Sequence, residues 1–189
     1  MNSVDDLTAP YEFIKDKLTT SYIDIDSLEL SNDSSYGVFQ LNKDDEIPAM
    51  IISLNQNKET WKTKNNIFLT IDSGKIVNTR GLKYDFSIIY AQELTDFDKE
   101  YSGYIKFNDP ETEYLDITST FNTIKKGFIT LNSKQQNIEY VLIEESFNVP
   151  LIKWKGKNYY WLDNDGEVLK IKQILNPFKD TANLQLIKK

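Results

Sequence analysis

The chain has 189 residues, a formal net charge of −7 and a sequence pI of about 4.7, and it contains neither cysteine nor histidine. These features exclude disulfides, thiolate metal sites and catalysis by histidine or cysteine, and an acidic surface does not suit unaided binding to nucleic acid. The length fits one domain. We expect an N-terminal tether and helix over about residues 1–20 and a β domain over about residues 21–189.

The first residues carry no targeting signal that we recognise. They lack the basic start and apolar segment of a signal peptide, and no apolar run approaches the roughly 18 residues of a membrane-spanning helix. The sequence alone leaves two readings open, a cytosolic protein and the mature form of an exported one.

The segment "APYEFIKDKLTTSY" predicts the one convincing helix. Thr8 is a suitable N-cap and Pro10 fits the first turn. Phe13, Ile14 and Leu18 fall on one face, so the helix is amphipathic.

From Tyr36 onwards, short β-like runs alternate with turn residues, which favours a mainly β domain. Only the run Phe86–Gln92 also suits a helix. The predicted strands are Tyr36–Leu41, Ala49–Asn55, Glu59–Lys62, Ile67–Ile71, Lys75–Thr79, Phe86–Gln92, Tyr101–Phe107, Glu113–Thr118, Phe128–Asn132, Ile138–Glu145, Leu151–Lys155, Asn158–Asp163, Glu167–Gln173 and Asn183–Lys188.

Two stretches, "FLTIDSGKIVNTRGL" and "YYWLDNDGEVLKIKQ", place a glycine after small polar residues and between apolar runs. A three-residue hairpin loop needs one left-handed residue, which glycine supplies, and Asp72 and Asp163 can accept bonds from turn amides. The rival interpretation is a calcium loop, which needs a bidentate glutamate six residues after the glycine. Lys172 occupies that position, so we predict two tight turns and no metal site.

The acidic pairs do not form an evident catalytic dyad. Glu144 and Glu145 are neighbours in a predicted strand and therefore point to opposite faces. The chain also lacks a Gly-x-Ser-x-Gly nucleophile motif and a glycine-rich phosphate loop. We predict no enzymatic activity and no cofactor, although carboxylates from distant segments could still converge on a glycan.

The aromatic side chains are divided between core and surface by strand alternation. In "IKWKGKNYYW" we expect a Lys-Gly turn at Gly156 and an inward Trp154. Tyr160 falls on the face opposite Tyr159 and Trp161, and one of these two faces is a candidate binding surface.

Three segments occur in a recognisable order: "IPAMIISLNQNKETW", "FLTIDSGKIVNTRGL" and "NYYWLDNDGEVLKIKQILNP", followed by a terminal "LQLIKK". Together they resemble the GfcB/YjbF family of group 4 capsule polysaccharide lipoproteins. The resemblance runs from about Ile47 to the end, with a divergent middle between Asp85 and Glu139. The matching positions are Trp61, Gly74, Ile76, Val77, Thr79, Gly81, Leu82, Tyr160, Trp161, Asp163, Gly166, Val168, Lys170 and Gln173.

The resemblance implies a lipoprotein on the periplasmic face of the outer membrane of a Gram-negative bacterium. It also implies an antiparallel β-sandwich or partly open β-barrel, and two partners from the same operon: an outer-membrane β-barrel secretion protein and a soluble periplasmic protein. Contact with the membrane would be through a lipid anchor, whose acylated cysteine is not in this sequence. No catalytic residues are implied.

We therefore predict a non-enzymatic domain that assists capsule or exopolysaccharide secretion by contacting a secretion partner or the glycan. Tyr160, Arg80 and Trp61 are the candidate contacts. We expect Arg80 to meet a carboxylate of its own domain rather than an acidic glycan, and Trp61 and Trp161 to lie mainly in the core. The family-motif residues expected to be structural are Gly74, Gly81, Trp161, Asp163, Gly166 and Gln173.

One alternative is a periplasmic carrier of a lipid or acyl chain, which would need an apolar cavity inside the β domain. A second is a carboxylate-based glycan hydrolase, which would need two carboxyl groups about 5 to 10 Å apart in a cleft.

Overall fold

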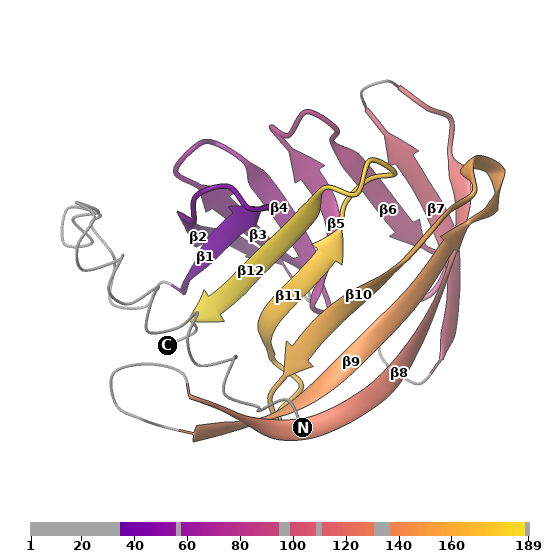
Figure 1. Ribbon diagram of the computed structural model, residues 1–189. Helices are drawn as coiled ribbons and strands as arrows, with labels where there is room; N and C mark the ends of the chain where they lie inside the picture. The colour runs from indigo at the N-terminus through magenta and orange to yellow at the C-terminus, as the bar shows by residue number, and fades with distance from the viewer. Residues whose placement is uncertain (1–34, 56–57, 95–98, 109–110, 131–136, 188–189) are drawn as a thin grey trace.

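The protein folds into a closed antiparallel β-barrel (Figure 1). The computed structural model describes residues 35–55, 58–94, 99–108, 111–130 and 137–187. Strands adjacent in sequence pair with each other, and β1 closes the ring by pairing with β12. The strands are β1 (Tyr36–Leu41), β2 (Ile47–Asn55), β3 (Lys58–Thr63), β4 (Phe68–Asp72), β5 (Lys75–Arg80), β6 (Phe86–Tyr90), β7 (Glu100–Phe107), β8 (Leu115–Thr130), β9 (Asn137–Val149), β10 (Trp154–Leu162), β11 (Val168–Ile174) and β12 (Thr181–Ile187).

The mainly β, antiparallel prediction is confirmed, and the sandwich or partly open barrel is corrected to a closed barrel. Closure requires the first and last strands to meet, and β1 and β12 pair over their whole lengths, from Tyr36–Ile187 to Leu41–Ala182. The run Phe86–Gln92 is a strand and not a helix. The predicted N-terminal helix lies outside the described residues.

The largest error in strand assignment concerns β8, which joins the predicted strands Glu113–Thr118 and Phe128–Asn132. The polar stretch between them resembles a loop, and residues 122–126 are indeed all exposed. Their backbone nevertheless pairs continuously with β9, apart from a bulge between Thr123 and Lys125. Backbone pairing, which imposes little demand on side-chain type, therefore decides this segment.

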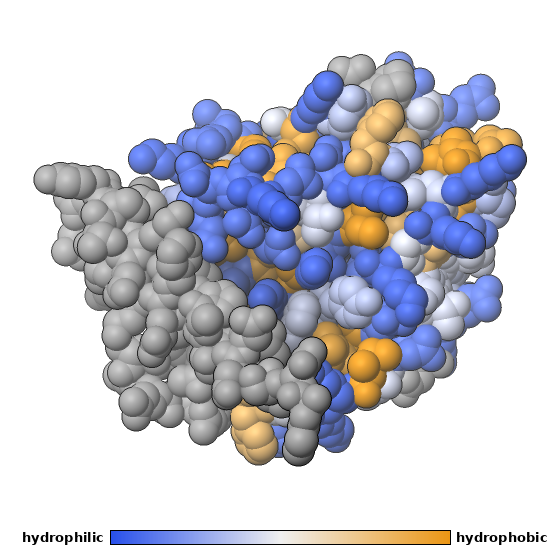
Figure 2. Space-filling view, viewed as in Figure 1, coloured by the Kyte–Doolittle hydropathy of each residue, from blue (hydrophilic) through white to orange (hydrophobic). Residues whose placement is uncertain are grey.

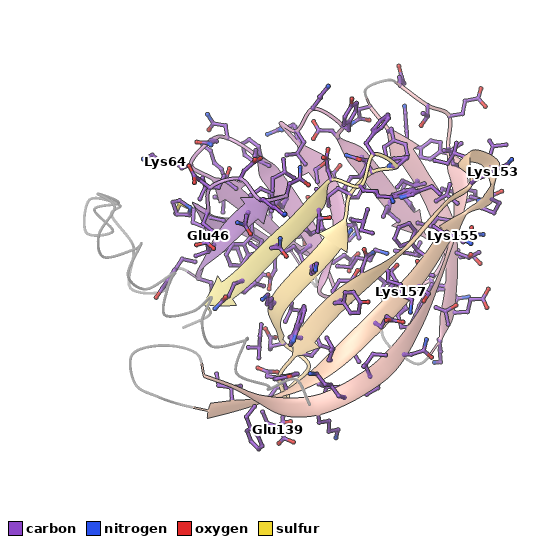
Figure 3. All side chains as sticks on the ribbon, in the orientation of Figure 1. Glu46, Lys64, Glu139, Lys153, Lys155 and Lys157 are labelled. Atoms are coloured by element: carbon purple, nitrogen blue, oxygen red, sulfur yellow. The ribbon has the colours of Figure 1, made fainter. Side chains whose placement is uncertain are left out.

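The predicted Lys-Gly turn at Gly156 is also wrong. A short 3₁₀ helix, Pro150–Ile152, precedes a single strand, β10, and Gly156 lies inside that strand opposite Phe147. An added Cβ at Gly156 would meet the Phe147 ring at 2.8 Å, so this glycine serves side-chain packing. The flanking Lys155 and Lys157 point outward along the same edge as Lys153 (Figure 3).

Both predicted glycine turns are present, but they differ in length. Asp72 pairs with Lys75, so Ser73 and Gly74 form a two-residue loop with φ of 47° and 85°, shorter than the three-residue loop expected. In the second turn the amide of Asp163 donates to the carbonyl of Glu167, and Gly166 has φ of 81°. This turn has the predicted three-residue loop.

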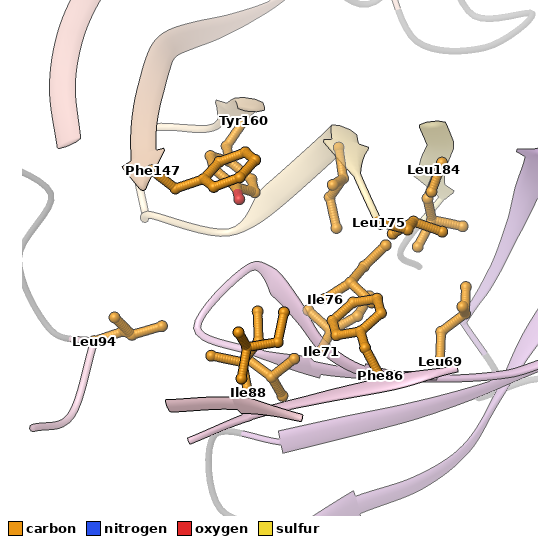
Figure 4. Packing of buried hydrophobic residues seen from close by; sticks show 14 of the residues in the cluster. Leu69, Ile71, Ile76, Phe86, Ile88, Leu94, Phe147, Tyr160, Leu175 and Leu184 are labelled. Atoms are coloured by element: carbon orange, nitrogen blue, oxygen red, sulfur yellow. The ribbon is translucent and has the colours of Figure 1, made fainter. Parts of the chain in front are cut away.

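Inward side chains from opposite walls meet and fill the barrel. In Figure 4, Leu184 of β12 points toward Leu69 of β4 and Phe86 of β6, and all three are at most 1% exposed. Trp154 is inward, as predicted, and contacts Phe147 at a ring-centroid distance of 4.7 Å. Because opposite walls are in contact, the interior is a packed core.

The wall is weakest between β5 and β6. Asn78–Ser87 is the one registered pair between these strands, whereas β6 and β7 pair from Phe86 to Tyr90. From this pair toward Lys75 of β5 and Tyr90 of β6, the two strands have no further registered pair and separate.

The visible face is dominated by hydrophilic side chains, with hydrophobic ones in small separate groups (Figure 2). Among the described residues, no helix is long and apolar enough to cross a membrane.

The two turn glycines provide a matched test of backbone and packing constraints. Alanine at either position must adopt a left-handed conformation, which costs about 1–2 kcal/mol. At Gly74 the added Cβ would also lie 2.2 Å from Cγ2 of Val168, whereas at Gly166 it meets nothing within 4 Å. We expect Gly74→Ala to lower the free energy of unfolding clearly more than Gly166→Ala, as measured by urea denaturation. Equal losses would contradict the packing role of Gly74.

Candidate functional site

A fully buried ion pair lies inside the barrel. Lys75, the first residue of β5, donates to Oε1 of Glu145 on β9, and their side chains are 2% and 0% exposed. Lys75 also donates to the hydroxyl of Tyr90 on β6. A buried charge is tolerated only when it is paired and hydrogen-bonded, so the surrounding groups decide whether this pair is stable.

The Glu145 carboxylate receives donors on both oxygens. Ser119 donates to Oε1 at 2.5 Å, and Tyr160 and Asn158 donate to Oε2 at 2.6 and 2.7 Å. Because the Ser119 proton goes to Glu145, Tyr90 is the donor in its own 3.1 Å bond with Ser119. Among the described residues, no buried side-chain polar atom lacks a partner.

Two amide side chains extend this network to the backbone. Gln173 on β11 binds both backbone groups of Ile76, accepting from its amide at 3.0 Å and donating to its carbonyl at 2.7 Å. Asn158 accepts from the amide of Ile174 at 2.8 Å. The Gln173 bonds join β5 to β11 through the barrel interior, and the Asn158 bond joins β10 to β11.

The network sets the charge state of the pair. Burial by itself raises the pKa of Glu145, but the charge of Lys75 and the bonds from Lys75, Ser119 and Tyr160 outweigh it, so the pKa lies below the ordinary 4.5. Burial lowers the pKa of Lys75, but Glu145 and Tyr90 outweigh it, so the pKa lies above 10.5. Burial and the neighbouring Glu145 raise the pKa of Tyr160 well above 10.0. The pair is therefore ionised and Tyr160 protonated at neutral pH.

A cleft of about 350 Å³ opens where β5 and β6 separate. Its lining combines side chains from the wall with the β4–β5 turn and the start of β3. The lining residues are Lys58, Asp72, Ser73, Val77, Ile88, Ile89, Tyr90, Ala91, Gln92, Glu93 and Leu94.

Tyr90 connects the cleft with the buried pair. It lines the cleft, and its hydroxyl binds Lys75 and Ser119 inside the barrel. The other polar groups of the cleft include Gln92, Glu93 and Asp72, the last of which lies 3.4 Å from Lys58. This mixture of a ring, carboxylates and an amide suits hydroxyl-rich ligands, because each group can bond or stack with a neutral sugar.

The described residues contain no group of three or more acidic side chains placed to hold a metal ion. Glu144 and Glu145 point to opposite faces, as the alternation predicts: Glu144 pairs outside with Lys157 at 2.7 Å, while Glu145 is inside.

The three predicted contact residues do not converge. Tyr160 is 1% exposed and bonded to Glu145, and Trp61 is 0% exposed in the core, where its indole donates to Glu59 at 2.9 Å. Arg80 is exposed, and its guanidinium lies 4.2 Å from the centre of the Phe68 ring. Tyr160 and Trp61 thus both face the barrel interior.

The family-motif residues have structural positions. Gly74, Gly81 and Gly166 all have positive φ, and Asp163 accepts the amides of Asp165 and Glu167 within its turn at 3.0 and 2.8 Å. Trp161 departs from the expected core position, because it is half-buried in a small cluster outside the barrel.

Sequence reasoning missed Lys75 and Tyr90. Lys75 directly follows the turn glycine, where a lysine normally faces solvent, and its partner Glu145 lies 70 residues away. The inward position of Glu145 was the available signal, since a buried carboxylate demands a cation or several donors.

The comparisons with known proteins agree with this fold. Residues 24–187 match the family model "Group 4 capsule polysaccharide lipoprotein gfcB, YjbF". The chain belongs to this family. No curated protein matches the chain.

Among solved structures, the chain is similar to the crystal structure of the hypothetical lipoprotein YmcC from Escherichia coli (K12). The TM-score is 0.72 at 14% sequence identity, and the likeness covers all of this chain and 97% of that one. At this identity the likeness concerns the fold. This member of the GfcB/YjbF family therefore has a barrel with a buried lysine–glutamate pair at its centre.

Removing one member of the pair should destabilise the barrel strongly. Glu145→Gln leaves the Lys75 charge buried without its partner, and we expect it to lower the free energy of unfolding by about 3–5 kcal/mol. The double variant Lys75→Met/Glu145→Gln has no uncompensated charge and should be more stable than Glu145→Gln alone. Glu144→Gln, the outward neighbour, should have little effect. Denaturant unfolding of the four proteins measures this, and a double variant weaker than Glu145→Gln would contradict it.

The pair should also impose two limits on stability against pH. The folded-state pKa of Glu145 is below its unfolded value, so its contribution is present above that value and is lost as the pH falls below about 4.5. The folded-state pKa of Lys75 is above its unfolded value, so its contribution is lost as the pH rises above about 10.5. The melting temperature should be measured at about eight pH values between about pH 3 and about pH 11. Its dependence on pH should be flatter for Lys75→Met/Glu145→Gln than for the unaltered chain. Parallel profiles would contradict this assignment.

Proposed function

We propose that this protein is a non-enzymatic lipoprotein domain on the periplasmic face of the outer membrane, which assists capsule or exopolysaccharide secretion by contacting the glycan. The observation that carries the proposal is the match to the group 4 capsule lipoprotein family over residues 24–187. The proposed partners are an outer-membrane β-barrel secretion protein and a soluble periplasmic protein of the same operon.

The packed interior favours contact at the surface over carriage of an acyl chain. Beside Lys75 the barrel interior leaves a gap of about 10 Å³, lined by Phe86, Ile105 and Trp154 among others. That volume is about the minimum for one water molecule. An acyl chain would have to displace core side chains such as these.

The cleft between β5 and β6 is the contact site that the described surface favours. Its volume of about 350 Å³ lies at the small end of the range for ligand sites, on the scale of one or two sugar rings. It offers exposed polar groups at Gln92 and Glu93 beside the apolar Ile89. Hydroxyls would meet the polar groups and a sugar face would lie against the apolar side.

The site can be tested with oligosaccharides prepared from the capsule or exopolysaccharide of the source bacterium. We expect the double variant Gln92→Ala/Glu93→Ala to weaken binding about thirtyfold, as two lost hydrogen bonds of about 1 kcal/mol each would do. The matched control is Asp116→Ala/Asn122→Ala, which removes one exposed carboxylate and one exposed amide from β8. Isothermal titration calorimetry gives both affinities.

Equal affinities for the two double variants would remove the cleft from the proposal. Release of new reducing ends during the titration would establish hydrolysis and contradict the non-enzymatic assignment.

Localisation and partnership need a separate test in the native bacterium. After membrane fractionation, we expect the full-length protein in the outer membrane, where a pull-down recovers a β-barrel secretion protein. A soluble, unacylated protein without such a partner would contradict the proposed role while leaving the fold unaffected.

A further inference from the structure

The edge of the cleft on its β6 side is apolar and exposed. Ile89 lines the cleft and is 53% exposed on the outside of β6. The cleft itself has room for about one or two sugar rings, so a longer glycan has to leave it across one of its edges. The surface beside each edge therefore decides the direction in which a longer chain runs.

Two exposed tyrosines continue the surface beyond Ile89. Tyr104 on β7 is the direct cross-strand neighbour of Ile89 and is 50% exposed. It alternates with the buried residues of β7, so its side chain points outward. Tyr114 precedes β8 and is 58% exposed, and its ring centre lies 6.5 Å from that of Tyr104. We call Ile89, Tyr104 and Tyr114 the outer strip.

A chain of contacts fixes the two tyrosine rings. The rings meet edge to face, with 80° between their planes. The ammonium of Lys106 lies 5.9 Å from the centre of the Tyr114 ring, and it binds the Glu111 carboxylate at 2.8 Å. Side chains that are already ordered lose less conformational entropy when a ligand binds them. This arrangement therefore favours the outer strip as a binding surface.

The opposite edge of the cleft is charged. It is formed by the β4–β5 turn and the start of β3, where the Lys58 ammonium lies 3.4 Å from the Asp72 carboxylate. Covering these hydrated ions with a sugar ring would cost free energy, because their water would have to be removed. A ring that lies on an exposed tyrosine instead removes apolar surface from water. A longer chain therefore leaves the cleft more favourably across Ile89.

Polar side chains border the outer strip. Asp116 on β8 pairs with Tyr104, and two residues along β7 the pair Ser102–Thr118 adds two hydroxyls. Ser102 and Asp116 are exposed. An aromatic face bordered by hydroxyl and carboxylate groups suits a sugar ring, which has an apolar face and hydroxyls around its rim. An acyl chain or an apolar peptide would leave these polar groups without partners.

The charges along this path favour a neutral sugar. Within the described residues, the carboxylates of Glu93 in the cleft and Asp116 beside the outer strip have no ion pair. Both would repel a carboxylated or sulfated sugar placed next to them. A neutral sugar meets no such repulsion and can donate hydroxyl hydrogens to both carboxylates.

We propose that the cleft and the outer strip form one track for a neutral glycan segment longer than about two sugar residues, with Tyr104 as the stacking surface. The inference rests on the proposed function, because its ligand is the glycan assigned there to the cleft. It adds the direction of the chain, from the cleft across Ile89 to Tyr104 and Tyr114. Neighbouring strands lie about 4.8 Å apart, so each step of the track is short enough for adjacent sugar rings.

The length of the ligand separates the track from the cleft. Oligosaccharides from the capsule or exopolysaccharide of the source bacterium are divided by gel filtration into a short fraction of about two residues and a long fraction of about six. Isothermal titration calorimetry gives the affinity of each fraction. We expect Tyr104→Ala to weaken binding of the long fraction about tenfold, through the lost stacking, and to leave binding of the short fraction unchanged.

Two further variants make the comparison specific. Phe178→Ala is the matched control, because Phe178 is 67% exposed on the β11–β12 loop and its ring also packs against a tyrosine, Tyr84, at 4.7 Å. It should change neither affinity. Tyr104→Phe retains the ring and should keep the affinity for the long fraction within about twofold. Near-ultraviolet circular dichroism verifies that each variant retains its fold.

The results distinguish failure of the track from failure of the proposed function. If the short fraction binds and Tyr104→Ala leaves the long fraction unaffected, the glycan is confined to the cleft and the inference alone is overturned. If neither fraction binds, both proposals are overturned.

Two other results would contradict the assigned ligand. If Tyr104→Ala abolishes recovery of a β-barrel secretion protein in a pull-down but leaves both glycan affinities unchanged, the outer strip is a protein contact. The affinity for the long fraction should change less than about twofold when salt is raised from about 0.05 M to about 0.5 M. A steep fall over this range would show ionic binding and contradict a neutral ligand.

Discussion

The ion pair between Lys75 and Glu145 is the constraint on which the rest of the barrel depends. A ring of strands can close around a core only if every inward group is apolar or satisfied, and a lysine at the start of β5 is neither by itself. Glu145 satisfies it from the far wall. Ser119, Tyr160 and Asn158 donate further hydrogen bonds to the Glu145 carboxylate. Through these bonds β8 and β10 are attached to the same buried group as β5.

This network also explains how the wall tolerates its weak joint. β5 and β6 share one registered pair, yet both strands are bound through the interior, β5 by Lys75 and β6 by Tyr90. The Gln173 side chain fixes β5 a second time, at both backbone groups of Ile76. Interior hydrogen bonds thus replace wall hydrogen bonds, and the strands can separate there to form a cleft without opening the barrel.

Local pattern was sufficient to locate most strands, and alternation correctly placed Trp154 inside and Glu144 and Glu145 on opposite faces, because both predictions depend on neighbours within one strand. Closure and the buried pair depend on residues far apart in sequence, which no local pattern encodes. Tyr160 illustrates the consequence: it was a candidate contact because of the strand face on which it falls, whereas in the structure it is 1% exposed and its hydroxyl donates to the Glu145 carboxylate. Trp161 shows the reverse, since an aromatic expected in the core lies on the outside.

The order of strands relates the two sides of the molecule. In the closed ring, β11 and β5 are separated by six positions in either direction, so Leu169 of β11 and the cleft beside β5 lie on opposite sides of the barrel. On the β11 side, Tyr140, Leu142 and Leu169 form a hydrophobic cluster separate from the barrel core. On the cleft side, Ile89 and Tyr104 are paired across β6 and β7 and are half exposed. The hydrogen bonds of the wall are therefore sparse on the side where outward side chains are exposed, and the interior bonds of Lys75 and Tyr90 hold the two strands there.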